Sequence, residues 1–240
     1  MKNHIDIRGL RVAVTGGTSG LGLALVRRLA VEGARVAFVA RTAPVVERIA
    51  KETGALGIVG DIGRKGDIYP IALQITANLG GLDVLINNAS SLGPTPLAPL
   101  ADTECEHLEE ALAVNVLGAF RLTKAVFGAL AAAARNEGGA LVINISSDAA
   151  VNAYPGWGAY GASKSALRHL TAIWGEEAKA DRVGFLSFDP GDMDTPLHAL
   201  AVPDADRSTL KRPERSAGEI VEAMRVTLSN RADHLVQVRA

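Results

Sequence analysis

The sequence predicts an α/β fold built on a single doubly wound parallel sheet with helices on both faces. Three observations predict this fold. Short apolar runs rich in β-branched residues alternate with longer segments rich in Ala and Leu. The apolar runs have almost no polar position, as expected of strands that are buried on both faces. The 240 residues are 48% hydrophobic but only 4% aromatic, which suits helices packed closely on a parallel sheet.

The expected elements alternate from the first strand to the last. The predicted strands are Arg11 to Thr15, Arg35 to Ala40, Ala55 to Gly60, Asp83 to Asn87, Ala140 to Ser146, Val183 to Asp189 and a short closing strand, His234 to Val238. The predicted helices between them are Leu21 to Glu32, Val45 to Thr53, Asp67 to Leu79, Glu104 to Ala134, Trp157 to Lys179 and Ala217 to Leu228. This order predicts right-handed crossovers and a single domain over residues 1–240.

The segment from Pro190 to Pro213 has turn residues but no regular apolar pattern. It follows the sixth predicted strand, at the edge where a doubly wound sheet binds its ligand. Irregular segments of this length in a compact domain are usually functional, and many are lids. We therefore expect a substrate loop or lid at about 190–213; the alternative is a disordered surface loop.

Composition and charge argue against several classes of function. The 25 Lys and Arg residues nearly balance 26 Asp and Glu residues, so nucleic acid and anionic membranes are not expected partners. No uninterrupted apolar stretch reaches the roughly 18 residues of a membrane span, and residues 1–6 form no apolar signal segment. We expect a cytoplasmic enzyme without a metal ion. The one cysteine, Cys105, allows no intramolecular disulfide and is expected to be a half-buried helix residue.

A glycine-rich segment follows the first predicted strand and opens the first predicted helix. Thr15-Gly16-Gly17-Thr18-Ser19-Gly20-Leu21-Gly22 can form a tight turn whose backbone N–H groups approach a pyrophosphate. The N-terminus of the following helix directs a partial positive charge at the same anion. Glycine clusters alone are common in turns. Between a strand and a helix, this one predicts a dinucleotide site formed by Gly16, Thr18, Ser19, Gly20, Leu21 and Gly22.

The end of the second predicted strand bears on the choice of cofactor. Folds that bind NAD often place an acidic residue there, roughly 20 residues after the glycine motif, to hold the ribose 2′-OH. Here the strand ends in Ala40 and Arg41. The Arg41 guanidinium can bind a 2′-phosphate, and Thr42 could add a hydroxyl. NADP(H) is therefore preferred over NAD(H); the alternative is a solvated arginine at a strand end.

Asp61 ends the third predicted strand, and Ile62 follows it. Both are expected at the cofactor, with the Asp61 carboxylate accepting a hydrogen bond from an adenine amino group. A turn-forming aspartate explains the position equally well.

Tyr160 is the only one of the three tyrosines with a lysine four residues later, Lys164. Residues i and i+4 share a face of a helix, so the ammonium can lie beside the phenol. A free phenol has a pKa of about 10, and a nearby positive charge would lower it towards neutral pH. Ser147 lies at the carboxyl end of the fifth predicted strand and could donate a hydrogen bond to a carbonyl oxygen.

Taken together, the motifs resemble the short-chain dehydrogenase/reductase family over nearly the whole chain. The matching motifs are Thr15-Gly-Gly-Thr-Ser-Gly-Leu-Gly22, Asn87-Asn88-Ala89, Asn115, Ser147, Tyr160-Gly-Ala-Ser-Lys164 and Pro190-Gly191. The 13-residue spacing from Ser147 to Tyr160 fits the family's usual arrangement. The resemblance implies a Rossmann fold and an NAD(P)-dependent oxidoreductase acting on a ketone or secondary alcohol.

The resemblance also implies a role for each matching residue. Tyr160 would pass a proton to or from the substrate oxygen, Lys164 would lower the tyrosine pKa and bind the nicotinamide ribose, and Ser147 would polarise the carbonyl. Asn115 would bind a water that links Lys164 to solvent. The implied cofactor contacts are Asn88, Ala89, Tyr160, Lys164, Pro190, Gly191, Met193 and Thr195.

Two positions depart from the family pattern. Ser90 follows Asn-Asn-Ala where the family often has glycine, and a small residue should be tolerated there. Asp148, after Ser147, could bind a polar substrate or face solvent, with solvent favoured.

The expected pocket walls do not name a substrate. In this family they come from the segments that here are Asp148 to Trp157 and Asp192 to about Arg212. Tyr154 and Trp157 suggest a flat aromatic wall. His198 is a candidate second proton donor, although isolated histidines in such segments are more often incidental.

Hydride transfer between NADP(H) and a ketone or secondary alcohol is the leading interpretation. The alternative is a non-catalytic NADP(H)-sensing or binding protein of the same fold, against which the complete set of Asn115, Ser147, Tyr160 and Lys164 argues. An epimerase or dehydratase of the related longer branch is disfavoured, because those enzymes usually carry a larger C-terminal substrate region. Since two of the helices commonly pair across a dimer axis in this family, we expect a homodimer or homotetramer.

Overall fold

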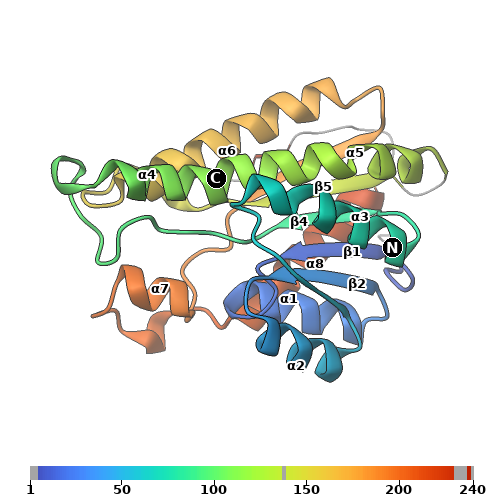
Figure 1. The fold of residues 1–240 in the computed structure, drawn as a ribbon, viewed down its shortest axis with the longest axis horizontal. Coiled ribbons are helices and arrows are strands. Elements are labelled where there is room, and N and C mark those ends of the chain that lie inside the picture. The colour runs from blue at the N-terminus through green and yellow to red at the C-terminus, as the bar shows by residue number, and fades with distance from the viewer. Residues whose placement is uncertain (1–4, 137–138, 230–236, 239–240) are drawn as a thin grey trace.

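A seven-stranded parallel sheet forms the centre of the molecule (Figure 1). The computed structural model describes residues 5–136, 139–229 and 237–238. The strands are β1 (Arg11–Thr15), β2 (Arg35–Ala40), β3 (Leu56–Val59), β4 (Val84–Asn87), β5 (Ala140–Ile145), β6 (Val183–Phe188) and β7 (Gln237–Val238). They lie in the order β3-β2-β1-β4-β5-β6-β7, and each neighbouring pair is parallel. This arrangement confirms the predicted fold class.

Helices cover both faces of the sheet. They are α1 (Gly20–Val31), α2 (Ala43–Thr53), α3 (Ile68–Leu79), α4 (Cys105–Leu112), α5 (Ala119–Asn136), α6 (Gly158–Glu177), α7 (Pro196–Ala201) and α8 (Pro213–Ser229). The core clusters place α1, α2 and α8 on one face and α3, α5 and α6 on the other. In Figure 1, α5 and α6 lie above the sheet, while α1 and α2 lie below it.

Successive strand residues point alternately into two cores. Val12 and Val14 of β1 pack in the core that contains α1 and α8, whereas Ala13 packs in the core that contains α3 and α5. All three side chains are fully buried. The absence of polar positions in the predicted strands follows from this burial on both faces.

The strand order reverses between β1 and β4, where the chain crosses from one half of the sheet to the other. A doubly wound sheet opens a crevice at this point, beyond the carboxyl ends of the strands. The glycine-rich segment after β1 and the Asn87-Asn88-Ala89 segment after β4 therefore border the same crevice.

Two helices begin two or more residues earlier than predicted, and both contain proline in the first turn. α2 has Pro44 within its first two residues, and α8 begins at Pro213 rather than at Ala217. Proline is well suited to the first turn, because its missing N–H would have no partner there. Pro44 and Pro213, which lie outside the predicted helices, thus belong to the first turns of α2 and α8.

The segment from Pro190 to Pro213 has more regular structure than predicted. It contains α7 and a short 3-10 helix, Arg207–Thr209. The Thr195 hydroxyl caps α7 by accepting the His198 N–H at 3.2 Å. A backbone bridge joins Met193 to Lys211, so the segment folds back on itself.

The long predicted helix Glu104 to Ala134 forms as three consecutive pieces. A π-helical segment, Ala113–Gly118, separates α4 from α5. By length and composition the stretch Cys105–Arg135 could cross a membrane, but 50% of its most apolar window is buried in the fold, as in the core helix of a globular protein. Cys105 is exposed at the start of α4, not half-buried as predicted.

The described part of the predicted closing strand forms β7. Gln237–Val238 pairs with β6. Residues 234–236 of the predicted strand lie outside the described residues.

We predict that Gly22→Ala lowers the free energy of unfolding by about 2 kcal/mol, because the new Cβ would overpack a closed contact. A Cβ at Gly22 would lie 2.1 Å from the Gly16 carbonyl oxygen and 2.5 Å from Asn88 Nδ2. Gly128→Ala in α5 is the control, since a Cβ there meets no atom within 4 Å. The control should gain about 0.5–1 kcal/mol in helix propensity. Urea denaturation measures both changes, and equal effects would contradict the prediction.

Candidate active site

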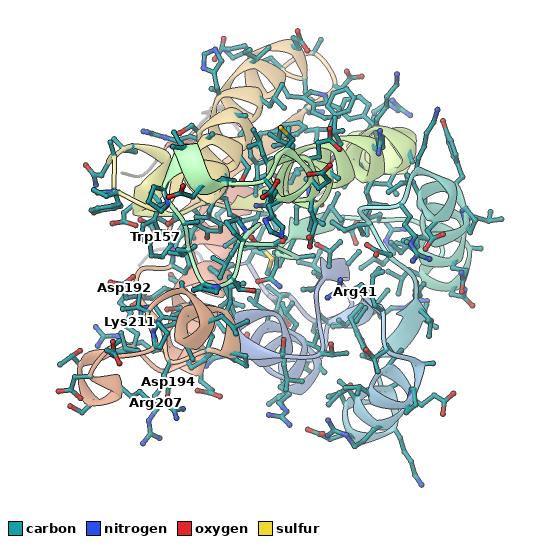
Figure 2. All side chains as sticks on the ribbon, turned by 60° about the vertical axis from the view of Figure 1, so that its left-hand side comes forward. Arg41, Trp157, Asp192, Asp194, Arg207 and Lys211 are labelled. Carbon is teal, nitrogen blue, oxygen red and sulfur yellow. The ribbon has the colours of Figure 1, made fainter. Side chains whose placement is uncertain are left out.

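A cleft of about 1100 Å³ opens at the carboxyl ends of the strands. Arg41 lies at one end, and Trp157 and Asp192 lie at the other, as Figure 2 shows. Each residue predicted to contact the cofactor lines this cleft. These residues are Gly16, Thr18, Ser19, Gly20, Leu21, Gly22, Arg41, Thr42, Asp61, Ile62, Asn88, Ala89, Tyr160, Lys164, Pro190, Gly191, Met193 and Thr195.

The glycine-rich turn presents the N-terminus of α1 to the cleft. Ser19 is the N-cap residue, but its side chain does not cap the helix, and the first turn has no acidic residue. The first N–H groups of α1 therefore remain available to an anion. Gly16 has a φ of +71°, and a Cβ there would lie 2.9 Å from Ala89 Cα. The turn thus requires glycine for both its conformation and its closeness to β4.

Asn88 holds the turn in place. Its Nδ2 donates to the Thr15 carbonyl at 2.8 Å. In return, the Thr15 hydroxyl accepts the backbone N–H groups of Asn88 and Ala89, each at 3.0 Å. Asn88 lines the cleft, but its side-chain amide is bound to the turn.

Arg41 and Thr42 form an unpaired polar group at the far end of the cleft. Within the described residues, neither side chain has a hydrogen bond or ion pair, and Thr42 is the N-cap residue of α2 without a side-chain cap bond. A guanidinium, a hydroxyl and a helix N-terminus thus lie together, a combination that suits a phosphate group.

Asp61 shapes the turn that follows β3. Its Oδ1 accepts the Gly63 N–H at 2.9 Å, and its own N–H donates to Asp67 Oδ2 at 2.9 Å. The turn-forming role considered from the sequence is therefore present, and the residue also lines the cleft.

Tyr160 and Lys164 lie one turn apart on α6 and are both buried, with 7% and 2% of their surface exposed. Lys164 Nζ donates to the carbonyl of Ile145, the last residue of β5, at 2.8 Å. It lies 5.5 Å from the centroid of the Tyr160 ring. Ser147 follows β5 and lines the same part of the cleft.

Burial decides the protonation of this pair. It raises the pKa of Tyr160 to about 12, opposed by the hydrogen bond with Ser147 and more weakly by one with Ser90. Burial also lowers the pKa of Lys164 to about 8. The Tyr-x-x-x-Lys spacing predicted a lowered pKa for Tyr160, whereas the structure raises it. The reason is that desolvation of the phenolate dominates, while the ammonium is hydrogen bonded to Ile145.

Asp148 is exposed to solvent, as expected, but it also belongs to the cleft. The Tyr154 hydroxyl donates to its Oδ2 at 2.7 Å, and the Ser147 hydroxyl lies 3.1 Å from its Oδ1. The bond to Asp148 raises the pKa of Tyr154. Asp148 therefore places a carboxylate beside the reacting end of the cleft.

The predicted site residue Asn115 lies beneath the cleft, in the π-helical segment. Its Nδ2 donates to the Ser91 carbonyl and to the Ser163 hydroxyl, each at 2.8 Å. Its Oδ1 accepts the Ser91 N–H at 2.8 Å and the Ser90 hydroxyl at 3.1 Å. Protein groups occupy the whole hydrogen-bonding capacity of the amide, so a water at this residue would have to bind the main chain.

Comparison with known proteins assigns the family. The sequence profile described as short chain dehydrogenase matches residues 11–206. The chain belongs to the short-chain dehydrogenase family. It is 31% identical over 194 residues to a 2-(R)-hydroxypropyl-CoM dehydrogenase of Xanthobacter autotrophicus, covering 78% of this chain and 76% of that protein. It is also 31% identical over 194 residues to a 2,5-dichloro-2,5-cyclohexadiene-1,4-diol dehydrogenase of Sphingobium indicum, covering 80% and 76%.

Solved structures of short-chain dehydrogenases share the architecture. A 3-ketoacyl-(acyl-carrier-protein) reductase from Brucella melitensis complexed with NADH superposes with a TM-score of 0.86 at 24% identity, over 93% of this chain and 94% of that one. A short chain dehydrogenase from Escherichia coli CFT073 complexed with NADPH superposes with a TM-score of 0.78 at 25% identity, over 93% and 92%. The first likeness, at its low identity, shows the fold alone.

Several polar residues beside the family's motif positions were missed in the sequence. Ser90, expected only to be tolerated, donates its hydroxyl to Asn115 Oδ1 at 3.1 Å. Ser163 joins Asn115 to the Tyr160 carbonyl, which accepts its hydroxyl at 2.7 Å. In the sequence, Ser90 is adjacent to Ala89 and Ser163 is adjacent to Lys164. Only the folded chain shows that both serines bond to the side-chain amide of Asn115.

We predict that Lys164→Met makes the protein more stable at pH 7, by about 2 kcal/mol. Lowering the pKa from 10.5 to about 8 corresponds to about 3 kcal/mol of burial cost, and loss of the bond to Ile145 removes about 1 kcal/mol. At a pH between about 8 and 10.5, Lys164 keeps its proton in the unfolded chain and loses it in the folded chain. Wild-type stability therefore rises with pH across the window, and the advantage of the variant shrinks.

Urea denaturation between pH 7 and 10 measures this difference. Lys124→Met, at an exposed position of α5, is the control and should show a pH-independent difference. A constant difference for Lys164→Met over the same range would contradict the assignment of a buried, partly deprotonating lysine.

Proposed function

We propose that the chain is an NAD(P)-dependent oxidoreductase that transfers a hydride between NADP(H) and a ketone or secondary alcohol, with Tyr160 as the acid/base. The observation that carries the proposal is the buried Tyr160 phenol, flanked by Ser147 and Lys164 in the same cleft as the uncapped N-terminus of α1. The nicotinamide cofactor supplies or accepts the hydride when bound.

The side chains divide the remaining work. The Ser147 hydroxyl donates a hydrogen bond to the substrate oxygen as it gains negative charge. Tyr160 passes the proton to that oxygen in reduction and takes it back in oxidation. Because its pKa is raised to about 12, the phenol is protonated at neutral pH and is ready for carbonyl reduction. The ammonium of Lys164 lies close enough to favour the phenolate that forms.

Three features of the far end of the cleft support NADP(H) over NAD(H). Arg41 is unpaired among the described residues, Thr42 has a free hydroxyl there, and α2 begins at the next residue. No carboxylate ends β2, where one would repel a 2′-phosphate. The E. coli short-chain dehydrogenase that superposes on this chain is complexed with NADPH.

We propose that residues 190–213 cover the substrate and that the protein assembles as a homodimer or homotetramer in the cytoplasm. Leu117, Phe120 and Ile173 support the assembly, since these apolar side chains on adjoining helices are 42%, 38% and 41% exposed. Apolar groups exposed together on helices commonly mark a contact between subunits.

We predict that Tyr160→Phe lowers kcat for ketone reduction by about 10²–10⁴-fold, because it removes only the hydroxyl that transfers the proton. NADPH binding should remain, as measured by the thermal shift of the variant. Tyr69→Phe is the control and should leave kcat unchanged, since that side chain is exposed on α3 and does not line the cleft. If Tyr160→Phe turned over a substrate at the wild-type rate, the proposed mechanism would be wrong and a binding or sensing role would gain support.

We predict that Arg41→Ala weakens NADP+ and NADPH binding by about tenfold and leaves NAD+ and NADH binding unchanged. Thermal-shift titration with the four nucleotides measures this, because a ligand of the folded state raises the melting temperature in step with its affinity. Arg48→Ala in α2 is the control, since Arg48 is exposed and lies 3.7 Å from Glu52. Preferential stabilisation by NAD+ and NADH would overturn the proposed cofactor preference.

A further inference from the structure

We propose that the cleft selects compact, apolar ketones or secondary alcohols without an anionic group, and that it prefers those carrying a protonated amine remote from the reacting carbon. The inference rests on the proposed function, because it concerns the substrate that meets Tyr160. It names a substrate class from the surfaces around that phenol.

The surface next to the phenol is apolar. Leu92, Ala149 and Tyr160 form a buried cluster against which four partly buried side chains pack. These four are Leu97, Trp157, Leu197 and Ala201. The Trp157 ring lies 5.7 Å from the Tyr160 ring at an interplanar angle of 67°, so one wall is a flat aromatic surface. A compact hydrocarbon ring or chain fits such walls, whereas a strongly hydrated group does not.

Carboxylates surround this apolar surface. Asp148, Asp189 and Asp192 line the cleft, and they come from the ends of β5 and β6. Burial raises the pKa of Asp189, and Asp148 and Asp192 raise it further, whereas Lys211 lowers it. Asp148 and Asp189 also disfavour ionisation of Tyr160. Asp148 also lies beside the reacting end of the cleft, because its Oδ1 is 3.1 Å from the Ser147 hydroxyl.

The opposite wall adds negative charge as well. Glu110 of α4 lines the cleft and accepts the Ser91 hydroxyl at 3.0 Å. Two histidines, His107 and His198, also line the cleft. His198 Nε2 lies 4.0 Å from Asp192 Oδ1, so a charged His198 would be paired already.

Lys164 and Lys211 act on Asp189, but no lysine or arginine in the described part of the chain is paired with Asp148 or Asp192. Arg41 and Lys164 are the only arginine and lysine among the described residues that line the cleft. Arg41 lies at the opposite end, as Figure 2 shows, and Lys164 is buried and bonded to Ile145. Three cations lie on the segment after β6, and none of them lines the cleft. Arg207 is paired with Asp194 at 2.8 Å and Lys211 with Glu219 at 3.0 Å, while Arg212 is exposed.

A substrate carboxylate, phosphate or sulfonate would consequently enter a negative field without a counter-ion. An ammonium group would gain attraction from Asp148 and Asp192, whose carboxylates are exposed at the mouth of the cleft. The apolar walls would contact the body of the substrate, and the carboxylates would favour a substrate that carries a positive charge.

Three cyclohexanones that differ only in the substituent opposite the carbonyl test this inference. The substituents are a methyl, a dimethylammonium and a carboxylate group. With saturating NADPH at pH 7 and low salt, kcat/KM should fall from the cationic to the neutral to the anionic compound, with about tenfold or more between the extremes. Added salt should reduce the differences in kcat/KM among the three compounds, because it screens exposed charges. Calorimetric titration of the NADPH-bound protein gives the same order for compounds that bind without turnover.

Charge-removing variants assign the selectivity to residues. The double variant Asp148→Asn, Asp192→Asn should reduce the ratio between the cationic and the anionic compound to about twofold. Glu177→Gln is the control; it lies exposed at the far end of α6 and should leave the ratio unchanged. A wild-type ratio near one, a ratio unaffected by the double variant, or binding of none of the three compounds overturns the inference. The proposed function would be contradicted by different results: no thermal shift with any nucleotide, or a Tyr160→Phe variant that turns over a substrate at the wild-type rate.

Discussion

The bond from Lys164 to the end of β5 is the constraint on which the rest of the site depends. A buried ammonium must have a hydrogen-bond acceptor, and the carbonyl of Ile145 is the one within reach. This bond ties α6 to the sheet at the level of the cleft. Tyr160, one turn earlier on the helix, is thereby held beside Ser147, which follows the same strand. The cost of burying the charge lowers the pKa of Lys164, so the position is a compromise between stability and chemistry.

A buried layer of amides and hydroxyls secures the same helix farther from the cleft. Asn144 of β5 donates to the Thr171 hydroxyl of α6 at 2.8 Å. Asn87 of β4 donates to Asn144 and to Thr123 of α5, at 2.8 and 3.0 Å. Polar bonds inside an apolar core are directional, so they set the registration of both helices on the sheet. The placement of Tyr160 thus depends on contacts made several turns away.

The two ends of the cleft have opposite electrostatic character. Arg41 and the N-terminus of α2 favour an anion at one end, whereas Asp148, Asp189 and Asp192 disfavour one at the other. This polarity matches a chain that would bind a phosphorylated cofactor at one end and an uncharged or cationic substrate at the other. Because these charged groups are segregated in space, a chain with a net charge of −1 would be able to discriminate between ligands by charge.

Local patterns in the sequence determined the order of strands and helices, the glycine turn and the Tyr160–Lys164 pair, because each follows from the period of a strand or helix or from one turn of chain. They misassigned Pro44 and Pro213, whose role as helix starts depends on which backbone groups are paired. Tertiary structure alone decided that burial raises the pKa of Tyr160 and that Ser90 and Ser163 both bond to Asn115. It also decided that Asp148 lines the same cleft as Asp189 and Asp192. The desolvation and the electrostatic field at a site depend on all the neighbours that the sheet brings together. The spacing of residues along the chain does not give the distances to those neighbours.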